Sequence, residues 1–307
     1  MNNPLTTILG SLLNVLLVLL VAPLCQGVLR KVTAIVQSRQ GPPLLQPYYD
    51  LLKLLGKEDI ESGDSPVMQR FAAYLSLATV LTTACLIPLG FSAPLNRGGD
   101  ALLLIYLLTL SGISTLLAGL AAGSTYSLVG ISRQMMTMIA LEPIFAITII
   151  IGALHTQSFS LDTVLNGSVY ANEAFPWSGM IMLGVTLLAF QAFVDRMPFD
   201  VSEAETEIME GPLVEYSGPK LALLKYASMV KLVIYSALFI DIFASWGAGL
   251  PFVFAWILFW AKVFVLVLLV TIVAATHARY RIDQAIRYFA SLLAAAFGAL
   301  VLASLGF

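Results

Sequence analysis

Charged residues, cysteines and histidines are all scarce in this chain. Charged side chains make up 11% of its 307 residues, whereas soluble domains carry roughly 25%, and this difference excludes a soluble globular domain. The two cysteines, Cys25 and Cys85, lie inside apolar runs and are interpreted as packing residues. An iron–sulfur cluster needs about four thiolates, so none is expected in this chain alone. With only His155 and His277, both predicted at helix ends, no metal or haem site is predicted either.

Hydrophobic runs fill most of the sequence instead. Hydrophobic residues make up 59% of the chain, and runs of about 20 residues are long enough to cross a bilayer. Only helices satisfy their own backbone groups in lipid, so the pattern predicts a single all-α transmembrane domain over 1–307. The first run has no basic residue before it and is too long for a secretory signal, so we expect it to be retained. The eight predicted spans are 5–29, 69–90, 101–120, 134–154, 178–194, 222–246, 252–276 and 286–306.

The basic residues predict the orientation of these spans. In this eight-helix plan, thirteen of the sixteen lysines and arginines fall in alternate loops; the opposite loops hold only Arg97, and Lys231 and Lys262 lie within spans. Basic residues favour cytoplasmic loops. We therefore expect both termini on the outer side. The acidic loop after the fifth span is expected in the cytoplasm.

The first predicted cytoplasmic loop contains an amphipathic helix. Its apolar residues recur at helical spacing: Leu44, Leu45, Tyr48, Leu51, Leu52 and Leu55. Asp50, Lys53 and Lys57 fall on the other face. The helix is either a membrane-surface anchor or part of a platform for a docked partner.

The loop after the fifth span concentrates acidic residues. Its carboxylates are Asp195, Asp200, Glu203, Glu205, Glu207, Glu210 and Glu215. Ser202 and Glu205 form a capping-box pattern, which predicts a short helix that starts at Glu203 and stops at Gly211-Pro212. On that helix Glu203, Glu207 and Glu210 would share one face, and their mutual repulsion would raise the pKa of one or more of them. The loop is either a solvated acidic segment or a row of proton-exchanging groups.

Four ionisable residues lie within predicted spans: Glu142, Lys231, Asp241 and Lys262. Each costs about 2.5–3.5 kcal/mol at the bilayer centre, so each is expected to face protein or water. Asp241 and Lys262 are predicted at similar depth, where they would form either a structural ion pair or part of a relay. Glu142 has no obvious basic neighbour except Arg133, so we expect it to stay protonated, as a proton relay requires.

Three long motifs carry a resemblance to a known family. They are RQGPPLLQPYYDLLKLLGKE in the first cytoplasmic loop, SRQMMTMIALEP at the fourth span and PFDVSEAETEIMEGPLVEYSG in the acidic loop. Together they resemble the membrane-anchoring subunit shared by complex I, as its H subunit, and energy-converting [NiFe] hydrogenases. Gly41-Pro42 precedes Pro43-Leu44-Leu45 rather than Asn-Arg, and Gly211 is followed by Pro212 rather than Phe. Both departures are more similar to the hydrogenase branch, with formate hydrogenlyase subunit 4 and Ech-type B subunits, and argue against a quinone site.

The resemblance implies a role within a complex in a prokaryotic plasma membrane and no activity of the chain alone. Segments 30–68 and 195–221 would dock the nickel-bearing large subunit and the iron–sulfur small subunit, which would hold all the metal. Antiporter-like subunits and lipids would be the lateral partners, and no nucleic acid is expected. The implied coupling residues are Glu142, Asp200, Glu203, Glu205, Glu207, Glu210, Glu215, Lys231, Asp241 and Lys262. The implied docking residues are Arg39, Tyr48, Asp50, Lys53, Arg133, Arg196 and Tyr216.

Two further functions remain open at this point. The chain could be the H subunit of a complex I-type oxidoreductase that contributes to a quinone site. It could also be a passive scaffold that anchors a redox module. A stand-alone transporter is disfavoured, because the spans lack paired broken helices in two matching halves. Neither the pumped ion, H⁺ or Na⁺, nor the electron donor follows from the sequence.

Overall fold

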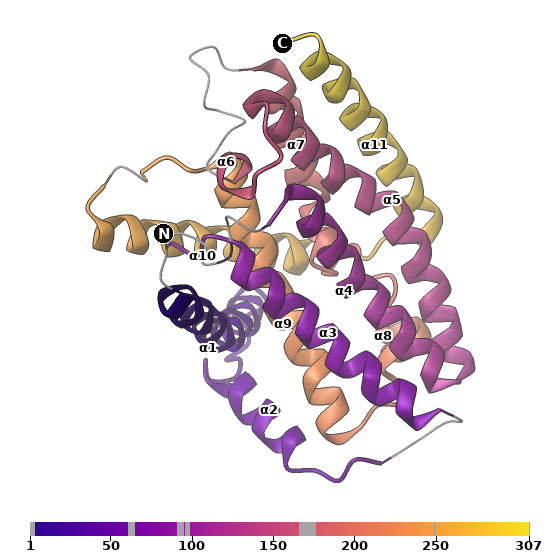
Figure 1. Ribbon diagram of the computed structural model, residues 1–307. Helices are drawn as coiled ribbons and strands as arrows, with labels where there is room; N and C mark the ends of the chain where they lie inside the picture. The colour runs from indigo at the N-terminus through magenta and orange to yellow at the C-terminus, as the bar shows by residue number, and fades with distance from the viewer. Residues whose placement is uncertain are drawn as a thin grey trace.

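The computed structural model describes residues 4–60, 65–90, 95, 99–165, 176–247 and 250–306. Its elements are helices (Figure 1), with one isolated antiparallel bridge between Asp100 and Ser160. The long helices are α1 (Pro4–Val36), α3 (Pro66–Leu86), α4 (Ala101–Ala122), α5 (Thr125–Thr156), α7 (Trp177–Phe193), α9 (Gly218–Phe243), α10 (Phe252–Thr276) and α11 (Ile282–Ser304). The short ones are α2 (Gln46–Leu55), α6 (Leu161–Val164), α8 (Glu205–Ile208) and the 3₁₀ helix η3 (Gly211–Leu213).

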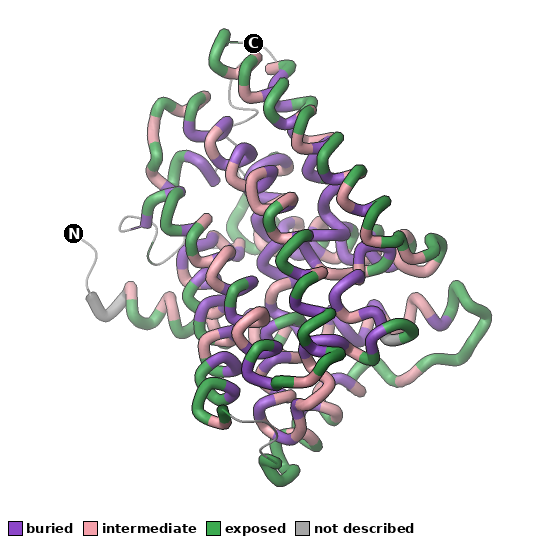
Figure 2. The backbone as a smooth tube through the Cα atoms, turned by 90° about the vertical axis from the view of Figure 1, so that its right-hand side faces the viewer, coloured by how far each residue is buried: buried purple, intermediate pink, exposed green. Residues whose placement is uncertain are grey.

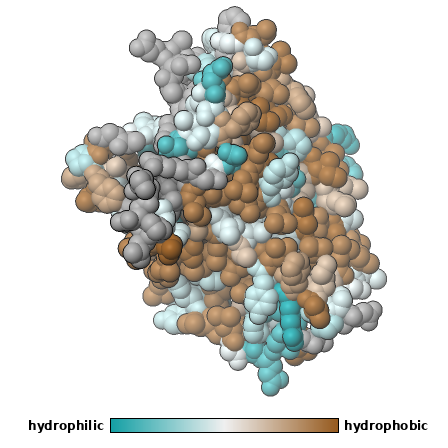
Figure 3. Space-filling view, viewed as in Figure 1, coloured by the Kyte–Doolittle hydropathy of each residue, from teal (hydrophilic) through white to brown (hydrophobic). Residues whose placement is uncertain are grey.

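All eight predicted spans are helices, which confirms the all-α membrane fold. Six of them are long and apolar enough to cross a membrane: α1, α4, α5, α9, α10 and α11. The fifth predicted span, α7, is apolar but has only 17 residues. α3 has 21 residues but is more polar than the six. Hydrophobic side chains cover most of the face in Figure 3, as expected of a surface that contacts lipid or other membrane subunits.

The centre of the bundle is α9. In its most apolar window 78% of the residues are buried, whereas 28% are buried in the corresponding window of α11. α9 packs against α1, α2, α3 and α10, while α11 packs against α5 and α7 at the edge. Figure 2 shows the resulting pattern, in which buried and exposed residues alternate along the outer helices. A polar residue on α9 is therefore surrounded by protein and needs a partner from it.

The predicted amphipathic helix is α2, but its apolar residues divide between two faces. Leu51 is buried, and the Tyr48 hydroxyl donates a hydrogen bond to the Leu20 carbonyl of α1. Tyr49 and Leu52 are instead exposed, at 59% and 66%. α2 thus packs on α1 and α9 with part of its apolar surface and leaves the rest, including Leu52 of the predicted stripe, uncovered.

The connector between α5 and α7 is partly helical. It contains the one-turn helix α6, and Leu161 and Val164 of that helix are buried. Residues 166–175 of the same connector, and Arg97 in the predicted outer loop, lie outside the described residues.

Candidate functional site

The acidic loop between α7 and α9 is folded against the bundle, because glycines allow its backbone to approach closely. Gly130 of α5 lies against the loop: a Cβ there would be 2.8 Å from Pro212 Cδ and 3.1 Å from the Ser202 carbonyl oxygen. Gly211 has a φ of +50°, and a Cβ on it would be 2.1 Å from the same Ser202 oxygen. The loop is thus fixed relative to α5 and is not a loose acidic tether.

The predicted row of three glutamates on one helix was wrong. α8 starts at Glu205, two residues later than expected, and has only four residues. Its preceding residue, Ala204, makes no side-chain cap. Met209 and Glu210 have left-handed backbone, with φ of 55° and 62°, so the helix ends before Gly211. Glu203 therefore precedes the helix and Glu210 follows it.

The loop carboxylates instead find separate partners. Glu207 lies 2.5 Å from the Arg133 guanidinium, Asp200 lies 3.0 Å from that of Arg279, and Glu210 lies 3.6 Å from Lys225 Nζ. The helix α8 includes Glu205, but its side chain is outside the described residues. Glu215 is half-buried. Ion pairs of this kind hold the loop in place. Asp200, although it is paired, and Glu203 are the two loop acids whose pKa values burial raises.

Asp200 and Glu203 both hold protons more tightly than ordinary carboxyls. Burial raises the pKa of Asp200 to about 6, although Arg279 opposes this as a charged hydrogen-bond donor. Burial, together with the negative charges of Asp200 and Asp195, raises the pKa of Glu203 to about 7. Arg196 and Lys231 act in the opposite direction on Glu203. Two carboxyls at the edge of the bundle therefore change protonation near neutral pH.

The raised pKa of Glu203 predicts a pH-dependent stability. A folded-state pKa of about 7, against an ordinary value near 4.3, means that the folded protein binds more protons than the unfolded chain between about pH 4.5 and 7. This stabilisation is complete below the ordinary value and is lost as the pH rises through the folded value. It amounts to at most about 3.5 kcal/mol for Glu203. We expect Glu203→Gln to flatten the fall in Tm between pH 5 and 8, measured on the detergent-purified complex.

The matched control for this measurement is Glu207→Gln. Glu207 lies in the same loop but is exposed and paired with Arg133. The Tm of Glu207→Gln is expected to fall with pH in parallel with the Tm of the wild type. Identical slopes for wild type and Glu203→Gln would show that Glu203 does not titrate in this range.

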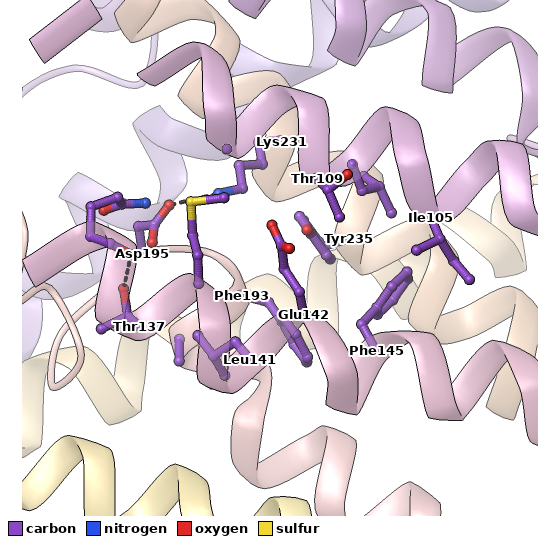
Figure 4. Close-up of a pocket in the computed structure, with 15 residues that line it drawn as sticks. Ile105, Thr109, Thr137, Leu141, Glu142, Phe145, Phe193, Asp195, Lys231 and Tyr235 are labelled. Carbon is purple, nitrogen blue, oxygen red and sulfur yellow. Dashed lines mark hydrogen bonds and ion pairs between the residues drawn. The ribbon is translucent and has the colours of Figure 1, made fainter. Parts of the chain in front are cut away.

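A polar cavity connects the loop to the middle of α5. Figure 4 shows Glu142 pointing into it, with Tyr235 and Lys231 on the α9 side and Asp195 beyond Lys231. The Lys231 ammonium lies 2.7 Å from an Asp195 carboxylate oxygen. The cavity offers about 40 Å³ to the centres of water molecules, and one water needs about 10–15 Å³. There is space for a few waters between these ionisable groups.

Glu142 differs in its neighbours from the prediction. Arg133, expected to be its nearest base, pairs with Glu207 in the loop, whereas Lys231 of α9 shares the cavity with Glu142. The sequence predicted that Lys231, as a lysine within a span, needs a partner. It did not predict that this partner is Asp195. The polar cavity-lining residues Thr109, Gln134, Thr137 and Tyr235 were also missed. They are neutral, and nothing in their spacing distinguishes them from other polar residues in spans.

The predicted ion pair between Asp241 and Lys262 does not form. Lys262 donates to the carbonyls of Ala244, at 2.6 Å, and Trp246, and its ammonium lies 3.9 Å from the centre of the Trp246 ring. Asp241 is 8% exposed, and its Oδ2 has no hydrogen-bond partner in the described part of the chain. Lysine side chains often extend out of the membrane interior, and here the Lys262 ammonium is held by carbonyl oxygens of the loop that follows α9.

The predicted docking residues are divided between the surface and the interior. Arg39 and Lys53 are exposed. Asp50 lies 2.6 Å from Arg30, and Arg196 donates to the Gln26 side chain at 2.6 Å. Tyr216 is buried and donates to the Ala118 carbonyl at 2.7 Å. Five of the predicted residues, Tyr48, Asp50, Arg133, Arg196 and Tyr216, thus make contacts within the chain that hold α2 and the acidic loop in place.

The fold and the site define an all-α membrane protein whose folded acidic loop leads to a polar cavity within the bundle. Residues 9–304 match the family model described as NADH dehydrogenase, and the chain belongs to this family. It is 34% identical over 245 residues to hydrogenase-4 component C of Escherichia coli K12, with 78% of this chain and 76% of that protein covered. It is 30% identical over 288 residues to formate hydrogenlyase subunit 4 of the same organism, with 90% and 92% covered.

A solved structure supports the same assignment. A chain of the membrane-bound sulfane sulfur reductase, an archaeal respiratory membrane complex, superposes with a TM-score of 0.88 at 26% identity and covers 97% of this chain and 99% of that one. The resemblance inferred from the three motifs is therefore confirmed. The protein is a membrane subunit of a group 4 hydrogenase or complex I-like complex.

Proposed function

We propose that this chain is the membrane-anchoring and energy-coupling subunit of an [NiFe] hydrogenase complex. The loop end of the bundle would face the cytoplasm and carry the large and small hydrogenase subunits. Hydrogen-evolving chemistry there would be linked to translocation of H⁺ or Na⁺ through antiporter-like subunits beside this chain. The observation that carries the proposal is the cavity in which Glu142 of α5 shares space with the Lys231–Asp195 pair.

The proposed coupling runs from the loop into the bundle. A change of charge in the docked redox module shifts the protonation of Asp200 and Glu203, whose pKa values lie at about 6 and about 7. The negative charge of Glu203 acts on the Lys231–Asp195 pair, because opposite charges attract strongly where water is scarce.

Lys231 is the link to Glu142. When Glu203 takes up a proton, it attracts the Lys231 ammonium less, and the ammonium can move toward Glu142, the other acid that lines the same cavity as the Lys231–Asp195 pair. An ammonium beside Glu142 favours its ionised form, so Glu142 releases its proton. The few waters that the cavity can hold would carry this proton away from the loop toward the neighbouring subunits. Asp241, deeper along α9, is available for a later step.

The experiment that tests this function identifies the partners of the chain. The native complex is purified in mild detergent through an affinity tag on this chain, and the co-purifying proteins are identified by mass spectrometry. We expect a nickel-containing large subunit, an iron–sulfur small subunit and hydrogen evolution by the preparation. Co-purification of NADH-oxidising or quinone-linked subunits without nickel would assign the chain to a complex I-type oxidoreductase instead.

A further inference from the structure

A second cavity lies at the loop end of the bundle, outside the path described above. It is formed where α5, the acidic loop and the start of α11 meet, and it offers about 260 Å³ to the centres of water molecules. Arg133, Arg279 and Arg281 line it, together with Glu207 and Asp283. α5 and α11 lie side by side here (Figure 1). Three arginines and two carboxylates thus line the cavity, and two of the arginines are already paired, Arg133 with Glu207 and Arg279 with Asp200.

The arginines of this basic cavity differ in the donors that they leave accessible, and Arg281 leaves the most. Arg281 is exposed and makes no ion pair within the described residues. Arg279 donates from its two terminal nitrogens to Thr206 and Asp200, but its buried Nε has no partner. Glu207 is already neutralised by Arg133. Guanidinium groups with free donors are matched to phosphate oxygens, which they bind in pairs.

The surroundings of the basic cavity favour a lipid as the source of that phosphate. Met136 follows Arg133 by one turn on the same side of α5 and is 51% exposed, and Ile139, further along the helix, is 70% exposed. These apolar side chains extend the surface from the cavity toward the bilayer interior. Tyr280, at 39% exposure, lines the cavity itself, as aromatic residues do at membrane interfaces. An acidic peptide would leave this apolar surface uncovered, whereas acyl chains cover it.

We propose that the basic cavity binds the phosphate group of an anionic phospholipid in the leaflet at the loop end of the bundle. Arg281 would bind the phosphate oxygens, Arg279 would stay held behind it by Asp200 and Thr206, and the acyl chains would lie along the outer side of α5. Basic pockets between membrane helices bind anionic headgroups in this way. The lipid would then sit against the Arg133–Glu207 pair and brace the loop that carries Glu203.

The test uses the intact complex in nanodiscs of phosphatidylcholine that contain a photoreactive phosphatidylglycerol probe. Labelled peptides are mapped by mass spectrometry as the probe fraction increases. We expect labelling near 276–287 of this chain, and Arg281→Gln should weaken it about fivefold, which corresponds to about 1 kcal/mol per basic residue. Arg287→Gln removes the same charge from an exposed position on α11 outside the cavity lining and should change labelling less than about twofold.

Competition distinguishes a lipid headgroup from free phosphate. Unlabelled phosphatidylglycerol should displace the probe, whereas inorganic phosphate and phosphatidylcholine should not. Displacement by inorganic phosphate as effective as that by phosphatidylglycerol would overturn the lipid assignment. Equal losses of labelling in Arg281→Gln and Arg287→Gln would reduce the site to general attraction by a basic surface. Labelling that appears only after the soluble subunits are stripped off would show that a protein partner occupies the cavity.

Discussion

Glu142→Gln is expected to uncouple redox turnover from ion translocation. An amide cannot take up or release a proton, so the number of ions moved per hydrogen evolved should fall by about tenfold or more. Hydrogen evolution under uncoupled conditions should stay within about twofold of the wild type, because Glu142 lies within the bundle and not at the loop end where we propose that the redox module docks. The two rates are measured together in proteoliposomes that contain the complete complex.

The control is Glu207→Gln, which removes a carboxylate from the exposed Arg133 pair and leaves the cavity intact. It is expected to pump normally. A passive scaffold would tolerate the loss of charge at Glu142 just as well, so normal pumping by Glu142→Gln would establish the scaffold function and end the relay proposal for this residue.

Lys231→Met is expected to impair both the stability of the complex and its coupling. The side chains of Lys231 and Asp195 are 17% and 28% exposed, so loss of the ammonium leaves a poorly hydrated carboxylate without its partner. A fully buried pair costs about 3–5 kcal/mol when one member is removed, and the partial exposure of Asp195 lowers our expectation to about 2 kcal/mol. The measurement is the Tm of the complex in mild detergent, with ion pumping assayed in parallel.

The double variant Asp195→Asn/Lys231→Met separates the two effects. It removes both charges, so most of the lost stability should return. Coupling should not return, because no ammonium remains to act on Glu142. Recovery of both stability and pumping in the double variant would show that the pair is structural only. Lys231→Arg, which keeps the charge, should stay close to the wild type in stability.

The long helices were predictable because a local property of the sequence, a run of apolar residues, determines each of them. A run of about 20 apolar residues has to be helical in lipid, and the same runs appear as α1, α4, α9, α10 and α11. The prediction for α5 began too late, at 134. The helix starts at Thr125, where the preceding Ser124 accepts a hydrogen bond from the Ser127 amide at 3.2 Å. Such a cap was visible in the sequence, but the apolar pattern alone did not include it.

The acidic loop was not predictable from local pattern. Ser202 and Glu205 have the spacing of a capping box. The Ser202 carbonyl, however, is packed against Gly211, which lies after α8, and against Gly130, which belongs to α5. This packing, together with left-handed backbone at Met209 and Glu210, ends α8 after four residues. Tertiary contacts therefore decided where each glutamate lies, and a helical periodicity could not anticipate them.

The pairing of ionisable groups was only half predictable. That Lys231 and Lys262 need partners follows from the cost of a charge in lipid. Which partners they take depends on the angles at which helices cross. Lys231 reaches Asp195, 36 residues earlier, while Lys262 turns to the carbonyls of Ala244 and Trp246 and leaves Asp241 aside. A single sequence carries no record of these crossings.

Coupling through this chain requires that a loop carboxyl changes its protonation when the redox module changes state. Redox-induced infrared difference spectroscopy of the intact complex detects that change directly, because protonated and ionised carboxyl groups absorb at different frequencies. We predict a carboxyl difference band that disappears in Glu203→Gln and persists in Glu207→Gln. A difference spectrum that is the same in wild type and Glu203→Gln would contradict the proposed role of the loop.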